Sequence, residues 1–292
     1  MSRNVDPSMS VALSGSFDTE QLPRIAPEPV TVTVARTIRP GFEAQYLQWA
    51  DDVVSTLRTV HGCLGAGVLL PGPDIGRKAS AEMRAIAEAG FETGIHTWDH
   101  VLWQDNVRER DAAWTARQMG ASYKRFAEIF GHAPVTHGAA GWQMNDHAFR
   151  QIDTWGMAYA SDGRGTHPYI PSVDGQALNH VQLPTTLPTL DELVGVDGLD
   201  IDGAIDRILD LTATPNAAGL HVYTLHAELE GQRFLDPFLR LVDTWRARGL
   251  RVGTMAEAAA ALDPRSLPRH EVLLGEIAGR SGTLGLQGNA IS

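Results

Sequence analysis

Cysteine is almost absent from this sequence: Cys63 is the single one among 292 residues. One cysteine excludes an internal disulfide and fits a reducing compartment. Cys63 lies in an apolar, strand-like run, which favours a packed thiol over a nucleophile.

Basic residues are also scarce. Lys and Arg number 24 against 35 Asp and Glu, so the formal net charge at pH 7 is −11. Binding along a nucleic acid needs a basic face that meets the phosphates. The charge balance therefore argues against nucleic acid as a general partner, while it leaves local basic pockets open.

Long apolar runs are missing too. No stretch approaches the ~20 apolar residues that span a bilayer, and residues 1–20 lack the basic start and apolar block of a secretory signal. We therefore expect a cytoplasmic protein whose contact with a membrane is at most peripheral.

The residues that are present suffice for a sizeable core, since 43% are hydrophobic. From residue 91 onward, short strand-like runs alternate with amphipathic helical segments. This alternation is typical of right-handed βαβ units in a parallel sheet or barrel. About five or six such strands can be counted, fewer than the eight of a closed barrel.

We expect four parts along the chain. Residues 1–28 are polar and form a flexible leader, residues 29–72 form a β-α-β segment, and residues 73–263 form the barrel-like domain. Repeated glycines after Pro264 predict an extended or disordered tail over residues 264–292.

Several helix ends carry local signals. Asn145 is expected to cap a helix that Gly156 closes, Asp200 to cap another, and Asp236-Pro237 to begin a third. The most strand-like run of the chain lies at residues 220–226.

The stretch with the clearest chemistry is Gly94-Ile95-His96-Thr97-Trp98-Asp99-His100. Four residues make about one helical turn, so a strand that ends at His96 and curls into a turn brings both imidazoles to one side. Imidazole is a common zinc ligand, and a catalytic zinc usually takes three protein ligands. One more ligand must come from elsewhere. Two unrelated histidines remain the alternative, since such spacings arise easily in a chain with 11.

Three later strand-like runs also end in polar residues, as a catalytic rim at the carboxyl ends of parallel strands would. They are Val135-Thr136-His137-Gly138-Ala139-Ala140-Gly141-Trp142, Ala158-Tyr159-Ala160-Ser161-Asp162-Gly163-Arg164-Gly165 and His221-Val222-Tyr223-Thr224-Leu225-His226-Ala227-Glu228.

From about residue 68 to residue 280 the chain resembles the formamido-sugar deformylases of the polysaccharide deacetylase (NodB-homology) family. The resemblance is carried, in order, by Leu70-Pro71-Gly72-Pro73-Asp74-Ile75-Gly76, His96-Thr97-Trp98-Asp99-His100, Gly138-Ala139-Ala140-Gly141-Trp142, Ser161-Asp162-Gly163-Arg164-Gly165, Leu183-Pro184-Thr185-Thr186-Leu187-Pro188-Thr189 and Tyr223-Thr224-Leu225-His226-Ala227-Glu228.

The resemblance implies an α/β fold, an incomplete (β/α) barrel, that binds a divalent metal, usually zinc, through one aspartate and two histidines. His96 and His100 match the two histidines. His226 matches the general acid, and Asp162 lies in the block that holds this acid or the substrate. His226 also fits a core histidine at a strand end, and Asp162 fits a turn or helix cap.

Four residues are candidates for substrate contact. Arg164 is suited to a lipid phosphate or to solvent, and Glu228 to the sugar or to solvent. His137 and Trp142 fit the rim of the site or the stacking of substrate, with core packing as the alternative.

The family's first motif, a carboxylate pair in the opening strand, is missing here. Phe17-Asp18-Thr19 is a faint echo of it, which makes Asp18 a doubtful third ligand. Residues 29–72 instead resemble the first half of an antibiotic-biosynthesis monooxygenase, a ferredoxin-like half, through Thr33-Val34-Ala35-Arg36, Arg39-Pro40-Gly41-Phe42-Glu43 and Gly65-Ala66-Gly67-Val68. We expect this segment to serve docking or homodimerisation.

The function implied by the resemblance is removal of a formyl group from an undecaprenyl-phosphate-linked 4-formamido sugar, in lipid A modification. The alternative is a catalytically impaired barrel that binds sugar lipids or dimerises, because the carboxylate pair is absent. A cofactor-independent monooxygenase is a third hypothesis, which the missing second half of that fold weighs against.

Overall fold

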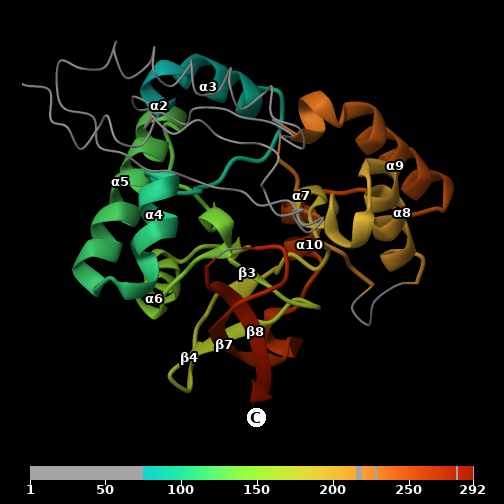
Figure 1. Cartoon of the computed structure of the whole chain (residues 1–292). Coiled ribbons are helices and arrows are strands. Elements are labelled where there is room, and N and C mark those ends of the chain that lie inside the picture. The colour runs from blue at the N-terminus through green and yellow to red at the C-terminus, as the bar shows by residue number, and fades with distance from the viewer. Residues whose placement is uncertain (1–74, 215–218, 227–228, 281, 292) are drawn as a thin grey trace, which may run out of the picture.

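The structure, a computed structural model, describes residues 75–214, 219–226, 229–280 and 282–291 (Figure 1). The leader, the β-α-β segment, Asp18 and Glu228 lie outside the described residues, so the expectations for them remain predictions. The helices are α2 (Ile75–Lys78), α3 (Ser80–Glu88), α4 (His100–Asn106), α5 (Ala112–Phe130), α6 (Asp146–Trp155), α7 (Leu190–Leu193), α8 (Ile201–Leu211), α9 (Leu235–Ala247) and α10 (Met255–Ala260). The strands are β1 (Thr136–His137), β2 (Tyr159–Ala160), β3 (Gly163–Arg164), β4 (Ile170–Val173), β5 (Gln176–Ala177), β6 (Val181–Gln182), β7 (Arg269–Gly275) and β8 (Leu284–Ile291).

Local capping chemistry accounts for most helix ends. The Asn145 side chain accepts from the backbone N–H of Ala148 and begins α6, which Gly156 ends in the left-handed conformation. Asp200 caps α8 in the same way. The prediction for α9 was wrong in its start: the helix begins at Leu235 after Phe234, without a side-chain cap, so Asp236 lies inside its first turn.

The central strands are short and parallel. β1 pairs with β2, and β2 pairs with β6. Ile95 adds a single parallel bridge beside β1, and the carbonyl of Val222 accepts from the N–H groups of Thr186 and Leu187 on the other side. This is the order of a (β/α) barrel, although the described residues do not close into one.

Two expected strands are therefore only extended segments. The run into His96 contributes one bridge through Ile95, and residues 220–226 have no regular strand despite their composition. β-Propensity reports how well side chains suit a half-buried pleated surface, and it does not create a pairing partner.

The described residues after Pro264, expected as an extended or disordered tail, form two extended strands. β7 and β8 pair with each other and complete a five-stranded sheet in the order β3-β8-β7-β4-β5 (Figure 1). Its glycines serve close packing rather than disorder. A Cβ on Gly163 would lie 2.6 Å from the carbonyl oxygen of Gly285, and one on Gly288 would lie 2.7 Å from that of Glu271.

The core is divided among three clusters. One joins α4, α5 and α6 to the central strands around Trp103, Phe126 and Phe149. A second joins α7, α8 and α9, and Figure 1 shows α8 and α9 on the side of the strands opposite α5 and α6. A third lies around Tyr159 and Leu183. Among the described residues, no helix is long and apolar enough to cross a membrane.

Candidate active site

His96 lies at the end of the segment that bridges β1. The Ile95 N–H donates to the Thr136 carbonyl, and the Gly138 N–H donates to the Ile95 carbonyl. The His96 Nδ1 atom is 2.7 Å from the Gly138 carbonyl oxygen. Because a carbonyl only accepts, Nδ1 carries the hydrogen, and Nε2 keeps the lone pair that a metal would take.

His100 is the first residue of α4. The Asp99 side chain caps this helix by accepting from the Leu102 N–H at 2.9 Å, which fixes the turn between the two histidines. The ring centroids of His96 and His100 lie 5.1 Å apart at an interplanar angle of 46°. The two imidazoles therefore share one side of the turn, as their spacing predicts.

Two more histidines approach this pair. Desolvation by the surrounding protein lowers the pKa of His96 to about 4, against the opposing effect of the Gly138 hydrogen bond, and the charges of His100, His137 and His226 lower it further. Because the outer surface of His96 is exposed, solvent moderates this effect. The ring remains neutral near pH 7, which is the form that binds a metal.

The donor set fits a divalent metal in part. Two neutral imidazoles, one of them held by a backbone carbonyl, are suitable ligands. Among the described residues, however, no group of three His, Cys, Asp or Glu side chains is placed to hold an ion. Asp99 acts as a helix cap. A third ligand would have to come from beyond the described residues.

His137 and Asp162 form a buried pair, at 2% and 0% exposure, at the ends of β1 and β2. The His137 Nδ1 atom lies 2.5 Å from Asp162 Oδ1. Asp162 Oδ2 accepts from Gln182 Nε2 at 2.8 Å, while the Asp162 N–H donates back to Gln182 Oε1. Both carboxylate oxygens are thus used by His137 and Gln182.

His226 is held by the carboxylates of Glu230 and Asp191; the sequence offers Glu230 for contact with the sugar or solvent and assigns neither residue to His226. Its backbone N–H donates to Glu230 Oε2 at 2.9 Å, and the Tyr223 hydroxyl donates to the other oxygen of Glu230. Its Nδ1 atom is buried and lies 3.6 Å from Asp191 Oδ1. Asp191 in turn pairs with Arg280 at 3.2 Å.

A local signal did exist for part of this cluster. The sequence Thr189-Leu190-Asp191-Glu192 has the form of a capping box, and Thr189 and Glu192 cap each other at the start of α7. The box predicts the start of a helix whose first turn contains Asp191.

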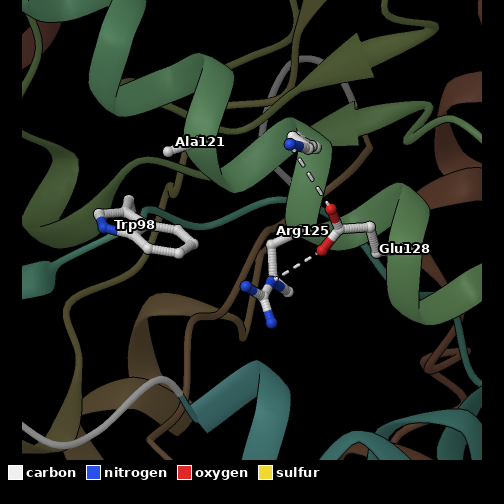
Figure 2. A pocket seen from close by; sticks show the side chains of 5 residues that line it. Trp98, Ala121, Arg125 and Glu128 are labelled. Atoms are coloured by element: carbon white, nitrogen blue, oxygen red, sulfur yellow. Dashed lines mark ion pairs between the residues drawn. The ribbon is translucent and has the colours of Figure 1, made fainter.

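A shallow pocket adjoins the turn between His96 and His100. Trp98, Ala121, Lys124, Arg125 and Glu128 line it (Figure 2). The Arg125 guanidinium lies 5.8 Å from the Trp98 ring and pairs with Glu128. Its volume of about 170 Å³ is below the roughly 300 Å³ at which small-molecule pockets begin. It is therefore too small to enclose a sugar.

Comparison with known proteins identifies the family of this chain. No family model matches the chain. The probable 4-deoxy-4-formamido-L-arabinose-phosphoundecaprenol deformylase ArnD of Shewanella sediminis (strain HAW-EB3) is 32% identical over 272 residues, which cover 92% of this chain and 84% of that protein. The chain belongs to this deformylase family. It is therefore a polysaccharide-deacetylase-like hydrolase of carbon–nitrogen bonds other than peptide bonds.

Further relatives agree with the deformylase assignment and with the predicted fold. The probable ArnD of Wigglesworthia glossinidia brevipalpis is 24% identical over 225 residues, 77% of each chain. A putative polysaccharide deacetylase from Mycobacterium smegmatis has a TM-score of 0.50 at 22% identity, over 69% of this chain and 74% of its own. A probable polysaccharide deacetylase from Pseudomonas aeruginosa PAO1 has a TM-score of 0.51 at 19% identity, over 63% of each. The expected fold class, of the polysaccharide deacetylase type, is confirmed.

The deformylase carries an arginine–tryptophan cluster beside His226. The guanidinium carbons of Arg164 and Arg280 lie 4.7 and 4.8 Å from the Trp142 ring centre. Both arginines pair with one oxygen of buried Glu192, at 2.6 and 2.7 Å. The Trp142 indole N–H donates to Thr185. Arg164 thus forms an ion pair with Glu192 and is not simply solvated. Its Nε atom is buried and has no hydrogen-bond partner among the described residues.

Proposed function

We propose that this deformylase removes the formyl group from a 4-formamido-4-deoxy-arabinose carried on undecaprenyl phosphate. Water and the formamide give formate and the free amino sugar, a step in lipid A modification. The name of the Shewanella relative supports this substrate. The observation that carries the proposal is the approach of His100, His137 and His226 to His96 at one edge of the parallel strands.

The proposal includes a divalent metal, with zinc as the first candidate. His96 would hold it through Nε2, and His100 through a nitrogen of its ring. Such an ion polarises the formyl oxygen and lowers the pKa of a bound water to about 7. Asp18, outside the described residues, remains the candidate third ligand.

His226 is proposed to protonate the departing amine. An imidazole suits this role because its ordinary pKa is near 6.5, so it both holds and releases a proton at neutral pH. The hydrogen bond from its backbone to Glu230 fixes the end of the extended segment 220–226, and Asp191 faces its Nδ1. The proton for the amine would then leave from Nε2.

The arginine–tryptophan cluster is proposed to receive the substrate beside His226. Trp142 is buried with its ring against the guanidinium groups of Arg164 and Arg280, so its proposed part is to hold these arginines beside the substrate. The Nε of Arg164 is a donor suited to an anionic oxygen. Glu228, outside the described residues, remains a candidate for contact with the sugar. Since the implied substrate sits in a membrane, we propose peripheral contact with the inner membrane from the cytoplasmic side.

A second function is favoured by one observation, the lack of a third metal ligand among the described residues. The same fold would then bind the lipid-linked sugar without turnover, or dimerise through residues 29–72.

Formate release from the lipid-linked 4-formamido sugar distinguishes the two functions. We expect release by the wild-type chain and its loss in His96→Ala and His226→Ala. His147→Ala is the matched control, because His147 is exposed on α6. Equal rates in all four proteins would refute the site assignment. Sugar-lipid binding without formate release from the wild-type chain would support the binding protein instead.

A further inference from the structure

Two histidines outside the deformylase site face each other beside the second sheet. His167 follows β3, and His270 lies in β7. Their Nε2 atoms are 3.1 Å apart, and their rings meet at 70°. His270 is buried and His167 is half-buried. The site chemistry described above uses neither of them.

The hydrogen bonds of His270 fix where its hydrogen lies. Its Nδ1 atom is 2.8 Å from the carbonyl oxygen of Gly288. Since a carbonyl oxygen only accepts, Nδ1 carries the hydrogen. In the neutral ring, Nε2 then carries a lone pair directed toward His167.

The hydrogen bonds of His167 lead to the same result. The backbone N–H of Thr166 donates to Gln287 Oε1 at 2.8 Å, which orients that amide. The Nε2 atom of Gln287 is 3.1 Å from the Nε2 atom of His167, and an amide nitrogen only donates. His167 Nε2 is therefore an acceptor, and its hydrogen lies on Nδ1, 2.8 Å from the Thr166 hydroxyl oxygen.

Two neutral imidazoles thus direct lone pairs at each other. This contact is repulsive unless a positive charge lies between the nitrogens. Zn–N bonds of about 2.0–2.1 Å, at angles between square and tetrahedral, separate two nitrogens by about 2.9–3.4 Å. The observed 3.1 Å falls in this range.

A shared proton is the other species that would relieve the repulsion. Zinc binding and the ¹⁵N spectrum of the two imidazoles distinguish a shared proton from a bound metal ion.

We propose that His167 and His270 form a second divalent-metal site, which takes a transition-metal dication such as Zn²⁺ through the two Nε2 atoms. On binding, the Gln287 amide gives up its hydrogen bond to His167, and water fills the remaining positions. With two protein ligands, the site binds more weakly than a three-ligand zinc site. It ties the segment that follows Arg164 to β7.

The test measures zinc binding by equilibrium dialysis on the full chain after chelator treatment. A His96→Gln/His100→Gln background removes the pair in the deformylase site. We expect about one zinc per chain in this background and at least a tenfold loss of affinity when His167→Gln is added. Adding His147→Gln, at an exposed histidine of α6, should change nothing.

Several outcomes would overturn the proposal. Unchanged zinc affinity after His167→Gln is added to the His96→Gln/His100→Gln background would do so. A background that binds no zinc while it folds normally by circular dichroism would do so too. The shared proton has its own signature: an imidazole ¹⁵N spectrum with a hydrogen on His270 Nε2 that zinc does not displace. Because His167 is half-buried, its replacement carries less risk of misfolding than that of His270.

Discussion

His226 Nδ1 lies 3.6 Å from Asp191 Oδ1. The same Asp191 side chain is anchored by Arg280, so its position is set by the fold rather than by the histidine. The oxygens of Asp162, the expected partner from the sequence, are taken by His137 and Gln182. We therefore expect Asp191 to orient His226, the proposed acid. We expect Asp162 to stabilise the site through its hydrogen bonds with His137 and Gln182.

Replacing Asp191 tests this division of roles. A carboxylate beside Nδ1 keeps the hydrogen on that atom and stabilises the charged ring. We expect Asp191→Asn to lower kcat for formate release by about tenfold to a hundredfold, with little change in KM, since proton transfer is worth about 10²–10⁴-fold. In the ¹⁵N spectrum, the signal of protonated His226 Nδ1 should become weaker. Asp210→Asn, at an exposed position of α8, is the control; a kcat equal to wild type in Asp191→Asn would contradict the role.

Removing the charge of Asp162 should act on stability instead. Leaving a buried polar group without its hydrogen-bond partner costs about 1–3 kcal/mol. We expect Asp162→Asn to lower the free energy of unfolding in urea by about that amount. His137→Gln combined with Asp162→Asn should cost less than the sum of the two single changes. Additive losses would mean that the pair does not interact in solution.

Local chemistry predicted the elements, and long-range contacts decided the site. The caps at Asn145 and Asp200 follow from side chains that bond a backbone only three residues away. Asp191 precedes His226 by 35 residues and meets it only because the chain folds, so spacing gave no sign of it. The glycines near the C-terminus predict an extended or disordered tail and not a sheet, because β3, which pairs with β8, lies about 120 residues earlier in the chain.

The buried imidazole of His180 makes the free energy of unfolding depend on pH. Burial lowers its pKa below the usual 6.5, against the charges of Asp162 and Asp153. Below pH 6.5 the unfolded chain binds a proton that the folded chain does not, so the free energy of unfolding falls as pH decreases through this window. His180→Gln should make the decline shallower between pH 7 and 5 in urea unfolding series. Because His96 and His167 have lowered pKa values too, some decline remains; an unchanged slope would show that His180 is protonated in the folded state.

Metal content at the deformylase site is the prediction with the widest consequence. If His96 and His100 hold zinc, elemental analysis of gently purified His96→Ala should show about one zinc per chain fewer than wild type, since two remaining ligands are too few for a tight site. Using His167→Gln as the common background removes the second proposed site from the count. Loss of the same zinc in Asp18→Ala would mean that the leader supplies the third ligand, and retention would direct the search to other carboxylates of residues 1–74. If wild type and His96→Ala contain equal zinc, the two histidines do not form a metal site, and sugar-lipid binding without turnover becomes the better account of this fold.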